Sequence, residues 1–147
     1  GVRDPIMLSM LEEVEQQVEQ QTKEYYEDID QGRYEIHFLN YGINGVMGDA
    51  EPLSEEKGHE AGVVFEVIAD TQELANMICS TLRSTFLHYG YPGRKSTAGN
   101  LAFPFAPSDI PFGPVYEFSV YHLMEIAGEE IEQLFPIEYP DWSSVPY

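Results

Sequence analysis

Basic residues are scarce in this sequence, which has 7 lysines and arginines against 26 aspartates and glutamates in 147 residues. The formal net charge at neutral pH is therefore -19. Phosphate groups, which dominate the binding of nucleic acids to proteins, would be repelled by this charge. The same repulsion excludes anionic membrane surfaces as partners. Beyond these exclusions, the acidic excess reports on solubility and identifies no particular activity.

Cysteine and long apolar runs are scarce as well. The single cysteine, Cys79, cannot form a disulfide within the chain, which suits a reducing cytoplasm. No apolar run approaches the roughly 20 residues that a membrane-spanning helix needs. The N-terminus lacks the basic and then apolar pattern of a signal peptide. We therefore expect a cytoplasmic protein.

The usual catalytic and cofactor motifs are missing. The four histidines, His37, His59, His88 and His122, show no metal-ligand spacing such as HxH or HxxxH, and a lone cysteine excludes a thiolate site. There is no GxxxxGK or GxGxxG phosphate-binding motif and no recognisable nucleophile of a Ser/His/Asp triad. The sequence thus indicates no metal and leaves any cofactor unknown.

Apolar residues are numerous enough to build one core. A chain of this length with 43% hydrophobic residues has the usual size of one domain, so we expect a single domain over residues 1–147. Asp4 followed by Pro5 indicates the start of a helix. Apolar residues then recur at steps of three, four and seven, and glutamates and glutamines fill the other faces, which predicts an amphipathic helix over 5–24. It is expected to pack on the core, with docking on a partner helix as the alternative.

The remaining periodicity predicts a mixed fold. Strands are expected at 34–41, 62–69 and 114–123, and a second helix at 71–89. This order predicts the α+β class: a two-layer sandwich, as a ferredoxin-like variant with a mainly antiparallel sheet and two packed helices. It is one strand short of that topology. The missing first strand is expected from an upstream segment, or part of the tail takes its place.

The second helix has the clearest sequence signals. Asp70 is the expected N-cap, and Glu73 completes a capping-box pattern. A short last helix is expected within 125–135, and Trp142 is expected to hold the tail on the body. Seven apolar residues should be buried between helices and sheet: Leu11, Val14, Val18, Leu74, Ile78, Leu82 and Phe86.

The loop that follows this helix, residues 88–105, carries the one Arg-Lys pair. A loop this long is usually functional or disordered, and its aromatic residues argue against disorder. We expect Phe103 and Phe105 to anchor it, while its polar part receives a carboxylate or phosphate. The alternative is that its cations are solvated and balance an acidic surface. The substrate-binding candidates here are Arg94, Lys95, Ser96 and Asn100.

A second loop, 42–52, combines glycines with polar residues. Asp49 and Glu51 are candidate catalytic groups as general acid or base, or alternatively ligands of a hard cation such as magnesium. Asn44 is a further candidate for binding substrate. His88 is the third catalytic candidate, because it precedes the Arg-Lys loop in the last turn of a helix, where the dipole favours its charged form. We expect Arg94 and Lys95 to stay partly open to solvent and to face this 42–52 loop, for which a plain surface turn is the alternative.

Four long stretches carry a family resemblance: "GVRDP", "YGINGVMGDAEP", "ADTQELANMICSTLRSTFLHYGYPGR" and "TAGNLAFPFAPSDIPFGPVYEFSVYHL". They cover nearly the whole chain and resemble the C-terminal portion of the acyclic terpene utilisation (AtuA-like) family. Members of that family are longer and have a large N-terminal α/β region. The start at Gly1 agrees with a piece of a longer or processed protein.

The resemblance implies breakdown of terpenoid and organic acids, often beside a small companion protein. We therefore expect a domain or subunit of a catabolic enzyme, of hydratase or lyase type, acting on a small carboxylate or acyl-thioester. The expected partners are a larger AtuA-like region or companion chain and a small anionic substrate, and we expect an oligomer. The alternative is a non-catalytic interaction or assembly module that docks on a larger partner.

Overall fold

The computed structural model describes residues 1–53, 56, 58–97, 100–104 and 106–138. Phe105 and Trp142, both expected to anchor segments, lie outside the described residues. The chain divides into two compact units, residues 1–115 and 116–147, and each is described by itself. None of the described helices is long and apolar enough to cross a membrane.

The first unit contains a two-stranded antiparallel sheet. Strand β1 (Tyr34–Tyr41) pairs with β2 (Gly62–Ala69) along its whole length, with Tyr34 opposite Ala69 and Tyr41 opposite Gly62. Both strands have the bounds predicted from the sequence. One face of the sheet carries the row Val63, Phe65 and Val67, which packs against the core, as strand alternation requires.

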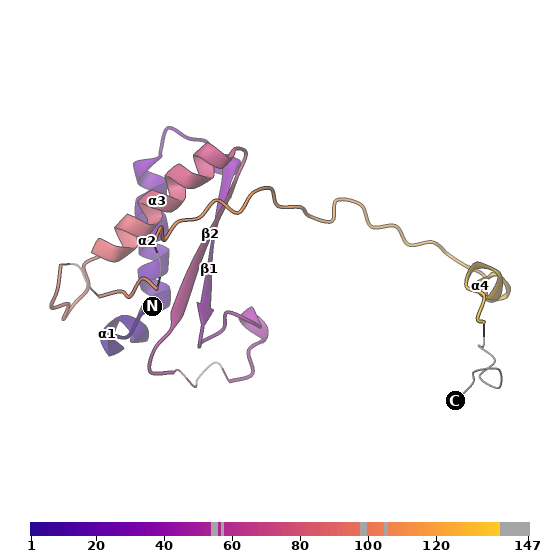
Figure 1. Cartoon of the computed structure of the whole chain (residues 1–147), viewed down its shortest axis with the longest axis horizontal. Helices are drawn as coiled ribbons and strands as arrows, with labels where there is room; N and C mark the ends of the chain where they lie inside the picture. Colours follow the sequence, from indigo (N-terminus) through magenta and orange to yellow (C-terminus); the bar gives the residue numbers. More distant parts are fainter. Residues whose placement is uncertain (54–55, 57, 98–99, 105, 139–147) are drawn as a thin grey trace, which may run out of the picture. The chain divides into compact units, whose positions relative to one another are not determined.

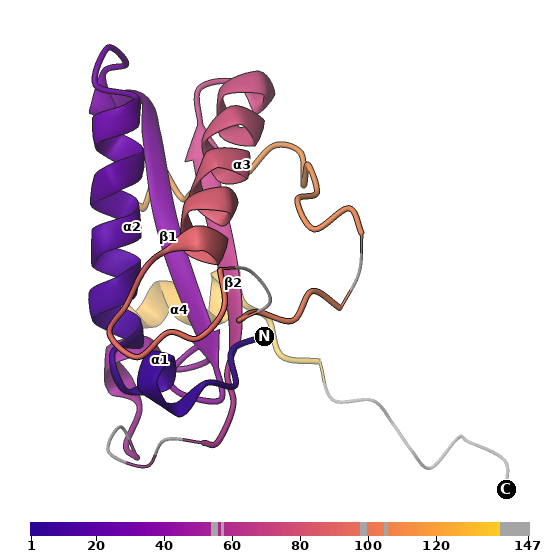
Figure 2. The same ribbon diagram turned by 90° about the vertical axis from the view of Figure 1, so that its left-hand side faces the viewer.

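Two long helices cover that face of the sheet (Figure 1). Helix α2 (Leu11–Tyr25) lies beside β1, and α3 (Gln72–His88) lies beside β2, as Figure 2 shows. All seven residues predicted to lie in the core are buried. The Phe65 ring contacts Phe38 in β1 and Phe86 in α3, edge to face, with centroids 5.3 and 4.9 Å apart. The fold is therefore α+β, with helices packed on an antiparallel sheet.

The helix starts differ in part from the prediction. Asp4 caps the first helix as expected, because its Oδ1 accepts the N–H of Ile6 at 2.9 Å. That helix, α1 (Pro5–Ser9), is however separate from α2. The break falls at Met10, whose N–H donates to the carbonyl of Met7 at 3.2 Å and so closes a tight turn. The predicted single helix over 5–24 was therefore wrong at this position.

The cap of α3 also differs. Thr71, rather than Asp70, is the N-cap, because Thr71 Oγ1 accepts the N–H of Leu74 at 3.2 Å. The Asp70 carboxylate instead pairs with Arg33 Nε at 2.8 Å. The prediction of Asp70 as N-cap was wrong, because the guanidinium of Arg33, just before β1, pairs with its side chain.

The third predicted strand, 114–123, does not form. Residues 110–127 have neither helix nor strand. A strand is stabilised by hydrogen bonds to a neighbour, and no described strand pairs with this segment. Helix α4 (Gly128–Leu134), in the second unit, falls within the predicted short helix. Short 3-10 turns, η1 (Gln31–Arg33) and η2 (Gly48–Ala50), complete the described elements.

Val2 covers one end of strand β2. Its N–H donates to the carbonyl of Ala61 at 2.8 Å, and its own carbonyl accepts the N–H of Ala61 at 2.9 Å. Leu101 forms a further antiparallel bridge to Val2. Because successive residues of a strand turn their N–H and C=O groups to opposite sides, Val2 lies on the edge away from β1. Beyond Val2, no described strand covers this edge of β2.

Candidate functional site

Arg94 binds the carboxyl end of α3. Its guanidinium donates to the carbonyl oxygens of His88 at 2.6 Å and Leu87 at 3.2 Å. Three further acceptors are the carbonyls of Tyr89, Ser96 and Thr97. The last carbonyls of a helix lack partners within it, and basic side chains often supply them. These five bonds match the five N–H donors of a guanidinium, so Arg94 joins the helix end to its loop.

The other polar residues of this loop also contact the loop itself. Asn100 Nδ2 donates to the carbonyl of Ser96 at 3.2 Å. His88 Nδ1 lies 3.1 Å from the carbonyl oxygen of Thr97, which requires the proton on that nitrogen. Lys95 is exposed to solvent. The described contacts therefore hold the loop in shape, and the roles predicted for these residues in binding substrate stay predictions.

The 42–52 loop is organised around the end of β1. The carbonyl of Asn40 accepts the backbone N–H groups of residues 43, 44 and 45 at 3.0, 3.0 and 2.9 Å. Asn44 and Asp49 are exposed. Glu51 Oε1 accepts the N–H of Leu53 at 3.0 Å, so it stabilises its own turn. The catalytic candidates of this loop thus lie on an open turn.

The structure does not bring the two candidate loops together. In Figure 1, segment 89–97 lies on the helix side of the first unit, and loop 42–53 lies on the sheet side. The described hydrogen bonds of Arg94 all stay within residues 87–97. The arrangement expected from the sequence, in which Arg94 faces loop 42–52, is not found in these contacts.

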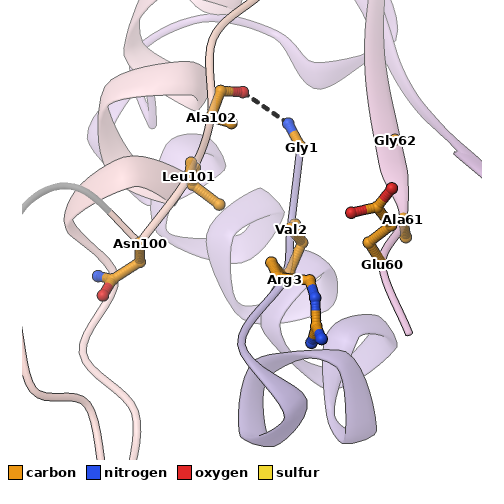
Figure 3. Close-up of a pocket in the computed structure, with 9 residues that line it drawn as sticks. All are labelled: Gly1, Val2, Arg3, Glu60, Ala61, Gly62, Asn100, Leu101 and Ala102. Atoms are coloured by element: carbon orange, nitrogen blue, oxygen red, sulfur yellow. Dashed lines mark hydrogen bonds between the residues drawn. The ribbon is translucent and has the colours of Figure 1, made fainter.

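One cavity, of about 420 Å³, surrounds the N-terminal residues (Figure 3). Asn100 is the one candidate residue among those that line it. Figure 3 shows its amide directed away from Val2, while Leu101 points toward Val2. The Gly1 amine donates to the carbonyl of Ala102 at 2.7 Å. The polar groups around this cavity do not converge on one point.

A second cleft, of about 310 Å³, lies along β2. Its lining includes residues 63–65 of the strand, residues 101–104, 108 and 109 of the loop, and three side chains of α3, namely Cys79, Arg83 and Phe86. Arg83 Nε lies 2.6 Å from Asp109 Oδ1, so an ion pair closes one side of the cleft. Burial raises the pKa of the Cys79 thiol, which favours its protonated form. Apart from this pair, the cleft is largely apolar.

Two buried polar side chains form a site that sequence reasoning missed. Glu15 in α2 and Asn40 in β1 are 6% and 9% exposed, and Asn40 Nδ2 donates to Glu15 Oε2 at 3.1 Å. The other oxygens of the pair, Glu15 Oε1 and Asn40 Oδ1, have no hydrogen-bond partner among the described residues. Burial raises the pKa of Glu15 to about 7; the bond from Asn40 opposes this, and the charge of Glu12 adds to it.

A proton on Glu15 would turn Oε1 from an acceptor without a described partner into a donor, while Oε2 keeps accepting from Asn40 Nδ2. Asn40 Oδ1 is a buried acceptor without a described partner in the same pair of side chains. A weak sequence signal exists, since position 15 lies four residues after Leu11 and three before Val18, on the apolar stripe of the helix. The pattern of the helix as a whole nevertheless predicts its glutamates on the solvated face.

In the part of the chain that the structure describes, no three His, Cys, Asp or Glu side chains gather to hold a metal ion. Comparison with known proteins gives no relative: no family model, no curated protein and no solved structure matches the chain. The site must therefore be interpreted from its own geometry.

Proposed function

We propose that this chain is an assembly domain of a larger cytoplasmic catabolic enzyme of the acyclic terpene utilisation type, and that it contributes contact surface rather than catalytic groups. The large region or companion chain of that enzyme would hold the chemistry on a small carboxylate or acyl-thioester. The proposal rests on two grounds, namely the sequence resemblance and the large apolar side chains that are exposed among the described residues.

The observation that carries this proposal is an exposed run of large apolar side chains. Phe112 is 96% exposed, Tyr116 91% and Phe118 95%. Large apolar side chains left exposed on a protein favour an interaction site. In contrast, the guanidinium that was expected to bind an anion uses its donors on backbone carbonyls.

A ferredoxin-like arrangement fits the same proposal. Helix α2, strands β1 and β2 and helix α3 follow the order of four of the six elements of that fold. The uncovered edge of β2 then corresponds to the place of the missing strands. In this proposal they come from outside the described sheet.

A second candidate function is a hydratase or lyase-type domain that uses Asp49, Glu51 and His88 as acid or base groups. The observation in its favour is that Asp49 lies exposed on a glycine-rich loop, where a substrate can approach. The assembly function predicts that substitution of an exposed apolar residue impairs the enzyme, whereas the catalytic function predicts this for Asp49, Glu51 or His88. Variants at these positions can therefore distinguish the two functions.

The experiment compares the assembly of two neighbouring variants of the enzyme that contains this domain. Phe118→Asp should reduce the assembled fraction, measured by sedimentation velocity, at least tenfold. Ser119→Asp adds the same charge at the next position and should leave assembly unchanged. Equal assembly by Phe118→Asp and the wild type would contradict the proposal.

A further inference from the structure

Asn40 makes two kinds of contact at the end of strand β1, one through its side chain and one through its backbone. Its side-chain amide donates to Glu15 in α2 at 3.1 Å. Its backbone carbonyl accepts the N–H groups of residues 43, 44 and 45 at 3.0, 3.0 and 2.9 Å. The same residue therefore joins a buried carboxyl to the start of the 42–52 loop.

This loop fits closely over the backbone of Asn40. A Cβ atom at Gly45 would lie 2.7 Å from the backbone nitrogen of Tyr41 and 2.8 Å from the carbonyl carbon of Asn40. Ile43 packs against the main core cluster. Because hydrogen bonds and close packing both fix the loop at this point, a displacement of Asn40 also displaces residues 43–45.

The carboxyl at the other end of this contact has two states of different polarity. Glu15 is 6% exposed and Asn40 9%, and one oxygen of each side chain has no hydrogen-bond partner among the described residues. A buried carboxylate that lacks hydrogen bonds is costly, whereas a protonated carboxyl supplies a donor. Ionisation of Glu15 therefore favours an arrangement in which its carboxylate reaches water.

The neighbours of Glu15 on the helices and on β1 also disfavour its ionised form. Burial raises the pKa of Glu15 most, the bond from Asn40 opposes this, and the negative charge of Glu12 on the same helix raises the pKa further. The side chains that α1 and α3 bury are all apolar. On β1, His37 occupies an odd position and so lies on the opposite face of the sheet from Asn40.

The segment after α3 borders the same core and contains two cations. Tyr91 is buried in the core cluster, and its hydroxyl donates to Asp4 at 2.7 Å. Arg94 donates to backbone carbonyls at the end of α3, and Lys95 is exposed. The contacts of both cations therefore lie away from Glu15. The other titratable side chains of this segment and of the 42–52 loop are Tyr89, Asp49 and Glu51.

We propose that the ionisation of Glu15 and the conformation of the 42–52 loop are coupled through Asn40. While the carboxyl is protonated, the pair stays closed and residues 43–45 keep their bonds to the Asn40 carbonyl. When the carboxyl is charged, the contact opens, Asn40 shifts, and the loop takes a second arrangement. The coupling acts within one chain and does not depend on the proposed assembly function.

NMR titration of the full-length, isotope-labelled chain tests this coupling. The carboxyl carbon of Glu15 should titrate with a midpoint of about 7, and the amide signals of residues 43–45 should shift with the same midpoint. In Glu15→Gln these amide signals should show no shift at that midpoint. Glu13→Gln, on the exposed side of α2, should behave as the wild type. His59, in the segment before β2, is present in all three proteins, so any titration of its imidazole is common to them.

Asn40→Ala tests the path between the two ends. This variant keeps the backbone carbonyl that residues 43–45 use, but it lacks the amide that reaches Glu15. The Glu15 carboxyl should still titrate, and the amide signals of the loop should no longer follow it.

Two results would overturn this inference. One is that the amide signals of residues 43–45 do not shift at the Glu15 midpoint in the wild type, or shift equally in Glu15→Gln. The other is that these signals still follow Glu15 in Asn40→Ala. Neither result involves the assembly of the complete enzyme, so the proposed function stands or fails separately, through the assembled fraction of the Phe118→Asp variant.

Discussion

Asn40 Nδ2 donates a hydrogen bond to Glu15 Oε2 at 3.1 Å, and this bond joins strand β1 to helix α2 inside the core. The second oxygen of each side chain is buried without a described partner. A buried polar group without a hydrogen bond is destabilising. The pair is therefore best satisfied when Glu15 carries a proton.

The stability of the fold should depend on the protonation of Glu15. Its pKa is raised from 4.5 to about 7, so the folded state binds the proton more tightly than the unfolded state. This stabilisation is fully present below pH 4.5 and is lost as pH rises through about 7. The difference between the two pKa values corresponds to about 3 kcal/mol in the free energy of unfolding.

Glu15→Gln tests this dependence, because glutamine is a neutral mimic of the protonated acid. We expect the variant to exceed the wild type in unfolding free energy by up to about 3 kcal/mol well above pH 7, and to match it below pH 4.5. Urea unfolding of the variant and the wild type at a series of pH values gives the difference in their unfolding free energies as a function of pH. Glu13→Gln, on the exposed side of α2, should run parallel to the wild type. A pH-independent difference for Glu15→Gln would show that Glu15 is ionised in the fold.

Arg94→Ala should destabilise the fold, since five carbonyl oxygens at the end of α3 and in its loop lose their donor. We expect a loss of about 1.5 to 3 kcal/mol in the free energy of unfolding. Arg94→Lys should recover little of the stability that Arg94→Ala loses, because an ammonium group has three donors and lacks the planar geometry of a guanidinium. Lys95→Ala, next in sequence and exposed, is the control and should change stability by less than about 0.5 kcal/mol. Equal stability of the two alanine variants would contradict the capping role.

The N-cap of α3 makes a separate prediction. Thr71→Ala removes the oxygen that accepts the Leu74 N–H and should cost about 1 kcal/mol. Asp70→Ala removes an ion pair whose two side chains are about half exposed, and should cost less than about 1 kcal/mol. Thermal unfolding of both variants checks the order. A larger loss for Asp70→Ala would restore Asp70 as the cap.

The sequence predicted those features that depend on local pattern. Both strands and the buried stripe of α3 follow from alternation and from apolar residues at steps of four, so Ile78 and Leu82 were found in the core as expected. Asp4 caps its helix as expected, because its Oδ1 accepts the N–H of Ile6 while the Tyr91 hydroxyl donates to its other oxygen.

The features that were missed depend on neighbours distant in sequence. Asp70 is not the cap because Arg33 pairs with it, and Glu15 is buried, against the expectation, because Asn40 contacts it from another element. Phe103, expected to be buried, is 44% exposed, since residues 101–104 line an open cleft. The segment 114–123 has strand periodicity, but periodicity alone does not supply a pairing partner.

The central claim is that this domain contributes assembly surface and that its polar loops do not perform chemistry. The most direct test is the turnover number per assembled complex of the complete enzyme carrying Asp49→Asn, Glu51→Gln and His88→Asn together. We predict a value within about twofold of the wild type, because loss of a general acid or base costs roughly 100-fold or more and none is expected here. A loss of that size, with assembly intact by sedimentation, would contradict the claim and assign the catalytic groups to this chain.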